Sequence, residues 1–305
     1  MNNSIKKYGI IGFIILLLIG AYVLFTNKGT NQIAPNIAKE DAVNQNLTPE
    51  DSITHGHGLA VDAADSSKVY IATHHGLLVL INDKDLYAVG KSNDDYMGFS
   101  PNPKIANEFF SSGHPQSGGN IGFQTSIDGG VTWKKISDGL DGPVDFHAMG
   151  VSSLNPKLIF GWYQGNLQRS SDGGKNWQKI PIEFVVVRLI ADTANENIVY
   201  AASPHGLFIS TNRGESWQRT LEGYVSTLAI HPADAKTMIV ASEKLGLAKT
   251  LDKGLNWQKI NQSFGGETVL FIAYDWQKHE TLYILTDKNS LYKSQNGGEA
   301  WSKIR

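Results

Sequence analysis

Cysteine is absent from this 305-residue sequence. Its absence excludes disulfide bonds, thiolate metal sites, cysteine nucleophiles and lipid attachment to an N-terminal cysteine. Arginine is scarce, with five in the chain, and the formal net charge is only −2. A face that binds nucleic acid needs concentrated positive charge, so we expect no nucleic acid partner.

A long uncharged run stands near the N-terminus, where residues 8–25 read YGIIGFIILLLIGAYVLF. A run of this length is enough for a helix that spans a bilayer. Lys6 and Lys7 precede it, which favours a cytoplasmic N-terminus and an exported remainder. We therefore expect residues 1–25 to form a cytoplasmic stub and a single-pass transmembrane anchor, with the rest outside the cell membrane. A cleaved signal peptide, which would give a secreted protein, is the alternative, but a small-x-small cleavage pattern is missing.

Residues 26–54 are polar, with scattered proline and glycine and little periodicity. This composition is typical of a flexible linker. We expect the linker to join the anchor to a folded domain over residues 55–305.

Five segments repeat the pattern S/T-x-D/N-x-G-x-x-W. They are SIDGGVTW (126–133), SSDGGKNW (170–177), STNRGESW (210–217), TLDKGLNW (250–257) and SQNGGEAW (294–301). Their tryptophans are 44, 40, 40 and 44 residues apart. A regular period of this length indicates a repeat architecture with one supersecondary unit per repeat.

The pattern resembles the Asp-box, or BNR repeat, of sialidases, sortilin-type receptors and photosystem II assembly factors. Over residues 55–305 the chain is most similar to BNR-repeat proteins of Gram-positive bacteria that are loosely described as glycosyl-hydrolase-like, and THHG, MGFS, SGHP and DFHAM are its distinctive stretches. The resemblance implies a β-propeller in which each box joins two strands of a blade. A shared fold does not by itself assign a function.

The residues of the box fit a tight turn. Asp128, Asp172 and Asp252 can accept hydrogen bonds from the amides of the turn, and Asn212 and Asn296 keep the same acceptor oxygen. The box glycine supplies a positive φ. We therefore interpret the acidic residue as a turn former rather than a catalyst, and we expect the box tryptophans to be largely buried between blades.

Each unit also contains two apolar runs before the strand that enters the box, and the residues after the tryptophan form one more strand, which gives four short strands. Two units lie upstream of the second box: residues 55–91, where the box has decayed to INDKDLY, and residues 95–136, which contain the first box. Six units over residues 55–305 give about 42 residues each, the length of a four-stranded blade. We predict an all-β, six-bladed propeller preceded by one transmembrane helix. A seven-bladed ring would need strands from residues 26–54.

Six of the nine histidines lie between residues 55 and 147. In a propeller, the first strand of each blade begins, and the second ends, at the same mouth of the central channel. The residues that this topology places at that mouth are His55, His57, His147 and Met97 at starts of first strands, and His74, His75, His114 and His205 at ends of second strands. Met149 follows His147 on the same side of its strand. His231 and His279 fall at the opposite face, where we expect structural roles.

These positions predict a metal site. We expect at least three of His57, His74, His114 and His147 to share one ion, with His55, His75, Met97 and Met149 as outer members. Imidazole with thioether favours copper, and imidazole alone also suits zinc. The alternative is that hydrogen bonds to Asp95 or Asp145 satisfy surface histidines.

The resemblance to sialidases raises an enzymatic alternative. Those enzymes clamp a carboxylate with three channel-facing arginines, whereas only Arg188 lies on an expected first strand here, so a sialidase is not expected. Another glycoside hydrolase would use Asp95 and Asp145, which enter first strands at the histidine face, as acid and base or nucleophile. A protein-interaction scaffold is the third hypothesis. The expected ligand at the mouth is therefore a metal ion, a glycan or a protein.

Overall fold

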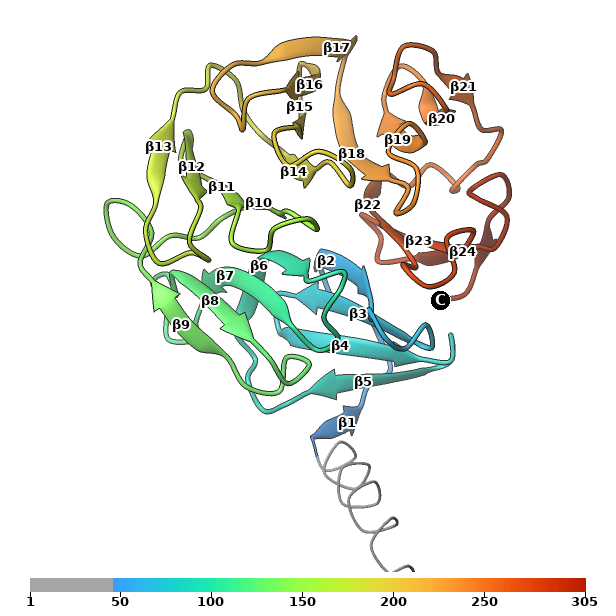
Figure 1. Cartoon of the computed structure of the whole chain (residues 1–305). Coiled ribbons are helices and arrows are strands. Elements are labelled where there is room, and N and C mark those ends of the chain that lie inside the picture. The colour runs from blue at the N-terminus through green and yellow to red at the C-terminus, as the bar shows by residue number, and fades with distance from the viewer. Residues whose placement is uncertain (1–45) are drawn as a thin grey trace, which may run out of the picture. The chain divides into compact units, whose positions relative to one another are not determined.

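The computed structural model describes residues 46–305. This part of the chain consists of strands and turns, with no helix. Six antiparallel sheets stand around a central axis as the blades of a propeller (Figure 1). The prediction of an all-β, six-bladed propeller built from four-stranded blades is confirmed.

Each blade orders its strands in chain order from the axis outwards. Blade 1 contains β2 (Gly56–Val61), β3 (Lys68–Thr73), β4 (Gly76–Ile81) and β5 (Asp85–Val89). Blade 2 contains β6 (Asp95–Pro101), β7 (Phe109–His114), β8 (Phe123–Ser126) and β9 (Lys134–Ser137). Blade 3 contains β10 (Ala148–Val151), β11 (Ile159–Tyr163), β12 (Asn166–Ser170) and β13 (Gln178–Ile180).

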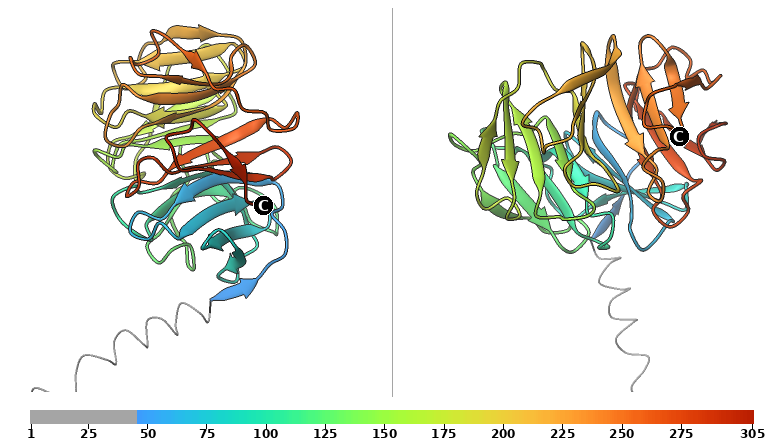
Figure 2. Two further views of the ribbon diagram at one scale, coloured as in Figure 1. Left: turned by 90° about the vertical axis from the view of Figure 1, so that its right-hand side faces the viewer. Right: turned by 45° about the horizontal axis from the view of Figure 1, so that its top comes forward.

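The second half of the ring is built in the same way. Blade 4 contains β14 (Arg188–Ala191), β15 (Val199–Ser203), β16 (Gly206–Ser210) and β17 (Gln218–Glu222). Blade 5 contains β18 (Val225–Ile230), β19 (Met238–Ser242), β20 (Gly246–Thr250) and β21 (Gln258–Lys259). Blade 6 contains β22 (Val269–Tyr274), β23 (Leu282–Thr286), β24 (Leu291–Ser294) and β25 (Ser302–Lys303). The inner strands β2, β6, β10, β14, β18 and β22 surround the axis, and side views show the blades packed face to face around it (Figure 2).

A fifth strand on blade 1 lies upstream of the expected start of the domain. β1 (Leu47–Pro49) pairs antiparallel with the outer edge of β5, with Leu47 opposite Val89. The propeller unit therefore begins at Leu47, whereas the sequence predicts a linker as far as residue 54. A three-residue edge strand is too short to show the alternation by which strands are recognised.

The predicted transmembrane helix over residues 8–25 lies outside the described residues. Within residues 46–305, no helix is long and apolar enough to cross a membrane.

The Asp-boxes form the hairpin device that their composition predicts. In each box the leading hydroxyl oxygen accepts the backbone N–H four residues on, as in Ser126 with Gly130 at 2.8 Å. The carboxylate of Asp128 accepts the backbone N–H of Thr132 at 2.9 Å, and the amide oxygen of Asn212 accepts that of Ser216 at the same distance. Gly130 has a φ of 86°, and a Cβ at this position would collide with the side chain of Leu77.

The box tryptophans pack between blades, although less completely than expected. Trp301 is buried, whereas the other four are partly exposed. Trp133 stacks on Tyr96 with ring centroids 4.8 Å apart, and Trp177 lies 4.9 Å from the ring of Phe146. The partial exposure arises because each indole covers the rim of a hydrophobic cluster rather than its centre.

Side-chain packing between the first and last blades closes the ring. Ile71 of blade 1 shares a core cluster with Tyr283 and Leu285 of blade 6. Asp83 of blade 1 accepts a hydrogen bond from the Tyr283 hydroxyl at 2.9 Å and pairs with Lys293 at 2.5 Å. β25 pairs with β24 in its own blade, so closure uses no strand exchange between these two blades.

Candidate metal centre

The histidine-rich face is the mouth at which the first strands begin. β2 and β3 are antiparallel, so the start of β2 lies beside the end of β3, and the backbone N–H of His74 donates to the carbonyl of His55 at 3.3 Å. A register shift between Gly56 and Gly58 turns this part of β2. The two effects bring His55, His57 and His74 to one place.

The three rings lie close enough to share an ion. The ring centroid of His57 is 4.1 Å from that of His74, and His55 is 5.0 Å from each of them. One ring nitrogen from each residue lies within 4.8 Å of the other two. Among residues 46–305, this is the one group of three or more histidine or acidic side chains close enough to hold a metal ion. The side chain of His57 is buried and that of His74 is about half exposed, so solvent reaches the group. These three histidines can hold a metal ion.

A buried carboxylate orients two of the three rings. Asp95 opens β6 in the next blade, and its two oxygens accept hydrogen bonds from the Nδ1 atoms of His57 and His74, each at 2.6 Å. A carboxylate can only accept, so each neutral ring carries its proton on Nδ1 and presents the lone pair of Nε2. Outer-sphere carboxylates of this kind orient histidine ligands in metal sites.

The electrostatics keep the carboxylate charged and one imidazole neutral. Burial of Asp95 acts to raise its pKa, but hydrogen bonds and attraction from His57 and His74 outweigh burial, so the pKa lies below its ordinary value. Burial and repulsion from His57 and His74 lower the pKa of His55. His55 therefore loses its proton at lower pH than an ordinary histidine, as a metal ligand must.

The structure places the other two predicted ligands in a separate group. Asp145 is 1% exposed, and one of its carboxylate oxygens contacts both histidines. That oxygen lies 2.9 Å from Nε2 of His114 and 2.8 Å from Nε2 of His147. The Nδ1 atom of His114 donates to the carbonyl of Gly119 at 2.8 Å, so both of its ring nitrogens are occupied. The hydrogen bond with Asp145 raises the pKa of His147, and burial opposes the change only in part. The four histidines expected to form one site are thus divided between Asp95 and Asp145.

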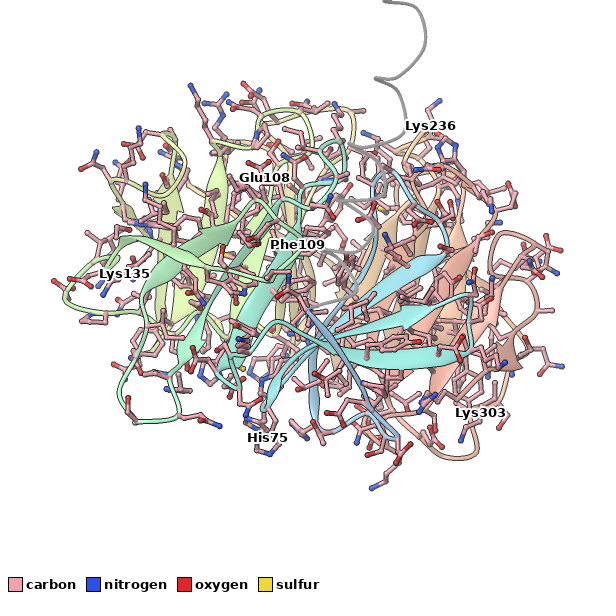
Figure 3. All side chains as sticks on the ribbon, turned by 90° about the horizontal axis from the view of Figure 1, so that it is seen from below. His75, Glu108, Phe109, Lys135, Lys236 and Lys303 are labelled. Carbon is pink, nitrogen blue, oxygen red and sulfur yellow. The ribbon has the colours of Figure 1, made fainter. Side chains whose placement is uncertain are left out.

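The expected outer members are also divided. Met97 lines a cavity of about 290 Å³ at the mouth, together with His55, His57 and His147. His75 lines a neighbouring hollow of about 500 Å³ that also contains His74 and His114. From below, His75 lies at one face of the propeller, whereas Glu108 and Lys236, in turns between first and second strands, lie at the other (Figure 3).

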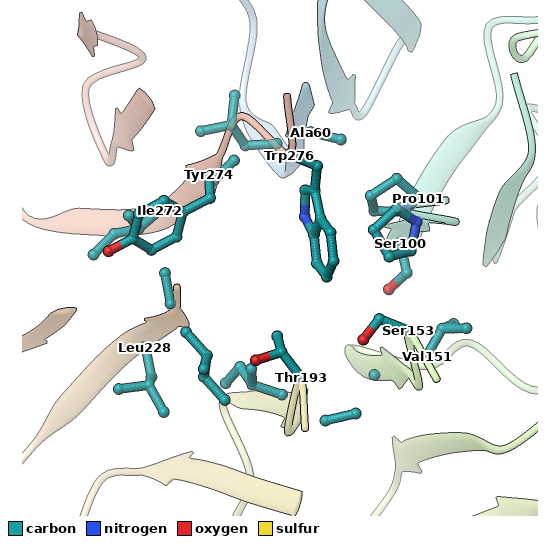
Figure 4. Close-up of a pocket in the computed structure, with 18 of the residues that line it drawn as sticks. Ala60, Ser100, Pro101, Val151, Ser153, Thr193, Leu228, Ile272, Tyr274 and Trp276 are labelled. Carbon is teal, nitrogen blue, oxygen red and sulfur yellow. The ribbon is translucent and has the colours of Figure 1, made fainter. Parts of the chain in front are cut away.

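Met149 lies farther along the channel, in a cavity of about 200 Å³ where the first strands end. Tyr274 and Trp276 stand there among aliphatic and small side chains (Figure 4). This cavity has no histidine in its walls. His231 and His279 pack against each other at this end with ring centroids 5.3 Å apart, and His231 accepts two backbone N–H groups of its own turn.

His55 was predicted only as an outer member of the metal site. It lies one residue before β2, and alternation along a regular strand gives no reason to place it against His74. The glycines on either side of His57 were the available signal, because glycines inside a strand often mark a bulge.

Comparisons with known proteins give a likeness only among solved structures. No protein-family model matches the chain, and no curated protein sequence matches it. The GH74 xyloglucanase from Xanthomonas campestris is 17% identical, over 84% of this chain and 46% of that one, with a TM-score of 0.56. YCF48 from Cyanidioschyzon merolae is 15% identical, over 85% of this chain and 88% of that one, with a TM-score of 0.53. The chain shares their propeller fold.

A further structure, of YCF48 bound to D1 peptide, has a TM-score of 0.52 and 18% identity. An ancestral GH74 enzyme has a TM-score of 0.55 and 17% identity, over 81% of this chain and 37% of that one. The chain therefore spans less than half the length of these two GH74 chains, and most of the length of YCF48. The resemblance to Asp-box propellers is confirmed at the level of fold.

Proposed function

We propose that this protein is a membrane-anchored, extracytoplasmic propeller that binds a transition metal ion, copper or zinc, at the channel mouth. His55, His57 and His74 are its ligands, and Asp95 positions two of them. The observation that carries the proposal is the pair of 2.6 Å hydrogen bonds that two adjacent imidazoles donate to one buried carboxylate. Anchoring rests on the uncharged run over residues 8–25.

The chemistry of the three donors narrows the choice of metal. Three neutral imidazoles suit Zn²⁺ and copper, and disfavour Mg²⁺ and Ca²⁺, which take oxygen ligands. Three protein ligands leave a coordination position open to solvent, which is the arrangement of exchangeable or catalytic sites rather than closed structural ones. Met97, a thioether in the adjacent cavity, is a further donor that would favour copper.

A carbohydrate-active enzyme is less well supported by the geometry. Asp95 and Asp145 would be its acid and base or nucleophile, but each carboxylate is already engaged by two imidazoles. Asp145 is also almost fully buried, so it has little access to a substrate. A protein ligand is a second candidate, since the structure of a structural neighbour, YCF48, contains a bound peptide.

The test is metal analysis of the purified full-length chain after zinc and copper are offered separately. We expect about one equivalent of bound metal, lost in His74→Ala. His75→Ala is the matched control, because this adjacent histidine lies outside the group of three, and it should bind as the wild type does. The proposal fails if the wild type binds no metal, or if His74→Ala binds as much as the control.

A further inference from the structure

One cation faces the same mouth without an anionic partner. Arg188 opens β14 in blade 4 and lines the cavity of about 290 Å³ that also contains His55, His57 and Met97. Its guanidinium lies 3.7 Å above the ring of Phe271. One nitrogen, Nη1, donates to the backbone carbonyl of the preceding residue at 3.1 Å.

No carboxylate among residues 46–305 forms an ion pair with this guanidinium, and its buried Nε has no hydrogen-bond partner there. The contrast with the other arginines is informative. Arg169, Arg213 and Arg219 each pair with a glutamate at the outer surface of the propeller. Arg305 donates to the backbone carbonyls of Lys84 and Asp51, whereas Arg188, in an inner strand, has neither a carboxylate partner nor a partner for its buried Nε.

Burial lowers the pKa of Arg188 to about 10, so the guanidinium remains charged at neutral pH. A guanidinium whose Nε is withdrawn from water without a partner is costly to keep, and a well-packed apolar side chain in its place is often neutral or stabilising. A propeller needs no such residue to close. An unpaired cation in a cavity therefore points to an anion that comes from outside the chain.

The cavity indicates the class of anion. Apart from the polar groups, its walls include Met97, Val186, Val187 and Leu270, so the group attached to the anion is apolar. Its volume is at the small end of ligand pockets, which span roughly 300–1,000 Å³. The planar guanidinium is matched in shape and hydrogen bonding by a carboxylate.

We propose that the channel mouth binds the carboxylate of a small aliphatic acid, or of an aliphatic residue at a peptide C-terminus, through Arg188. This site is a second feature of the mouth, and it does not depend on a metal ion at His55, His57 and His74.

The experiment uses the full-length chain treated with EDTA, and calorimetric titration with isovalerate. Isovaleramide, which has the same shape and no charge, is the matched ligand. We expect isovalerate to bind at least about tenfold more tightly than isovaleramide, a difference of about 1.4 kcal/mol. Equal binding of the acid and the amide, or binding of inorganic phosphate in place of isovalerate, overturns the proposal.

Two variants test the residue. Arg188→Gln should weaken isovalerate binding at least about tenfold, whereas Arg219→Gln, at a solvent-exposed ion pair, should leave it unchanged. Arg188→Leu should melt at or above the wild-type temperature while it loses binding, because it removes an unpaired charge. A lower melting temperature would show that Arg188 serves the fold, and unchanged binding in Arg188→Gln would show that it holds no carboxylate.

The source of the carboxylate is decided by comparing the peptide Ala-Ala-Leu, as free acid and as C-terminal amide, with isovalerate. A C-terminal ligand predicts that the free peptide binds more tightly than isovalerate and that amidation abolishes the gain. A small metabolite predicts that the peptide binds no better than isovalerate. These titrations contain no metal, so they succeed or fail independently of the metal centre.

Discussion

Replacing Asp95 with asparagine is the sharpest test of the metal centre. The substitution keeps the size of the side chain and removes the charge that His57 and His74 share through two hydrogen bonds of 2.6 Å. An amide has one acceptor oxygen, so one ring stays held, and the amide NH2 faces the Nδ1–H of the other. That second ring is no longer fixed with its Nε2 toward the ion.

The expected size of the effect follows from these two bonds. A hydrogen bond to a charged group contributes about 1.5–3 kcal/mol, and only the share that orders the ligands appears in metal affinity. Changing an outer-sphere residue typically weakens metal binding about 10- to 100-fold, which is about 1.4–2.7 kcal/mol. We expect Asp95→Asn to bind zinc or copper more weakly within that range, at the same stoichiometry.

Competition with a chromophoric chelator at fixed pH measures this change. Asp145→Asn is the matched control, because it is the same substitution at the carboxylate that holds His114 and His147. The control should bind metal within about threefold of the wild type, since an outer-sphere effect needs contact with a ligand. Unchanged affinity in Asp95→Asn would refute the orienting role, and an equal loss in Asp145→Asn would refute the choice of ligands.

Three further predictions concern stability and protonation. Asp128→Ala should lower the free energy of unfolding by about 1–2 kcal/mol, measured by chemical denaturation. Asp128→Asn should lower it by less than about 0.5 kcal/mol, because an asparagine oxygen makes the same hydrogen bond in other boxes. Equal losses would contradict the turn-forming role. His147 should titrate above its ordinary value in NMR, and in Asp145→Asn its pKa should fall. Because the pKa of His147 is raised in the folded state, protonated His147 stabilises the fold fully below its unfolded-state pKa of about 6.5. This stabilisation is lost as the pH rises through the folded-state pKa. His147→Gln should therefore destabilise more at pH 5.5 than at pH 8. Asp83→Ala should lower the free energy of unfolding by about 1–3 kcal/mol, because it leaves the half-buried Lys293 unpaired where the first and last blades meet. No change in stability would show that apolar packing alone closes the ring.

The repeat made most of the fold predictable from the sequence. The box couples a hydroxyl, an acceptor oxygen and a glycine at fixed offsets, so each copy marks the same hairpin. Blade 1 has lost its box, yet its strands keep the apolar runs of the other units and occupy the expected residues. β1 could not be predicted, because its pairing with β5 depends on an edge that exists only after blade 1 has folded.

The candidate site was predictable only in part. Topology assigns His57, His74, His114 and His147 to one mouth, since strand direction is a property of the repeat. It does not give their positions around the circumference of that mouth, which decide whether rings from different blades meet. Nor does it give the register shift in β2, which turns the strand beside His55.

The chemistry of the mouth is arranged asymmetrically on a nearly repetitive scaffold. Asp95, from blade 2, engages two histidines of blade 1, and Asp145, at the entry to blade 3, engages His114 of blade 2. Polar contacts of this kind also join one blade to the next, so they contribute to the ring as well as to the site. Blade 4 then presents an unpaired guanidinium from Arg188.

Such an arrangement has a consequence for binding. The carboxylates and imidazoles line one side of the mouth, on blades 1 to 3, and the cation comes from blade 4, while His55 and Arg188 line one cavity. A carboxylate that pairs with Arg188 would therefore lie in the same cavity as His55 and His57, two of the proposed metal ligands. If both proposals hold, isovalerate should bind more tightly to the zinc-loaded chain than to the metal-free chain, because the positive charge of the ion adds to that of Arg188 in attracting the carboxylate. By reciprocity, isovalerate should raise zinc affinity by the same factor. Titrating each ligand in the presence of the other measures both factors, and a factor of one in both directions would show that the two sites act separately.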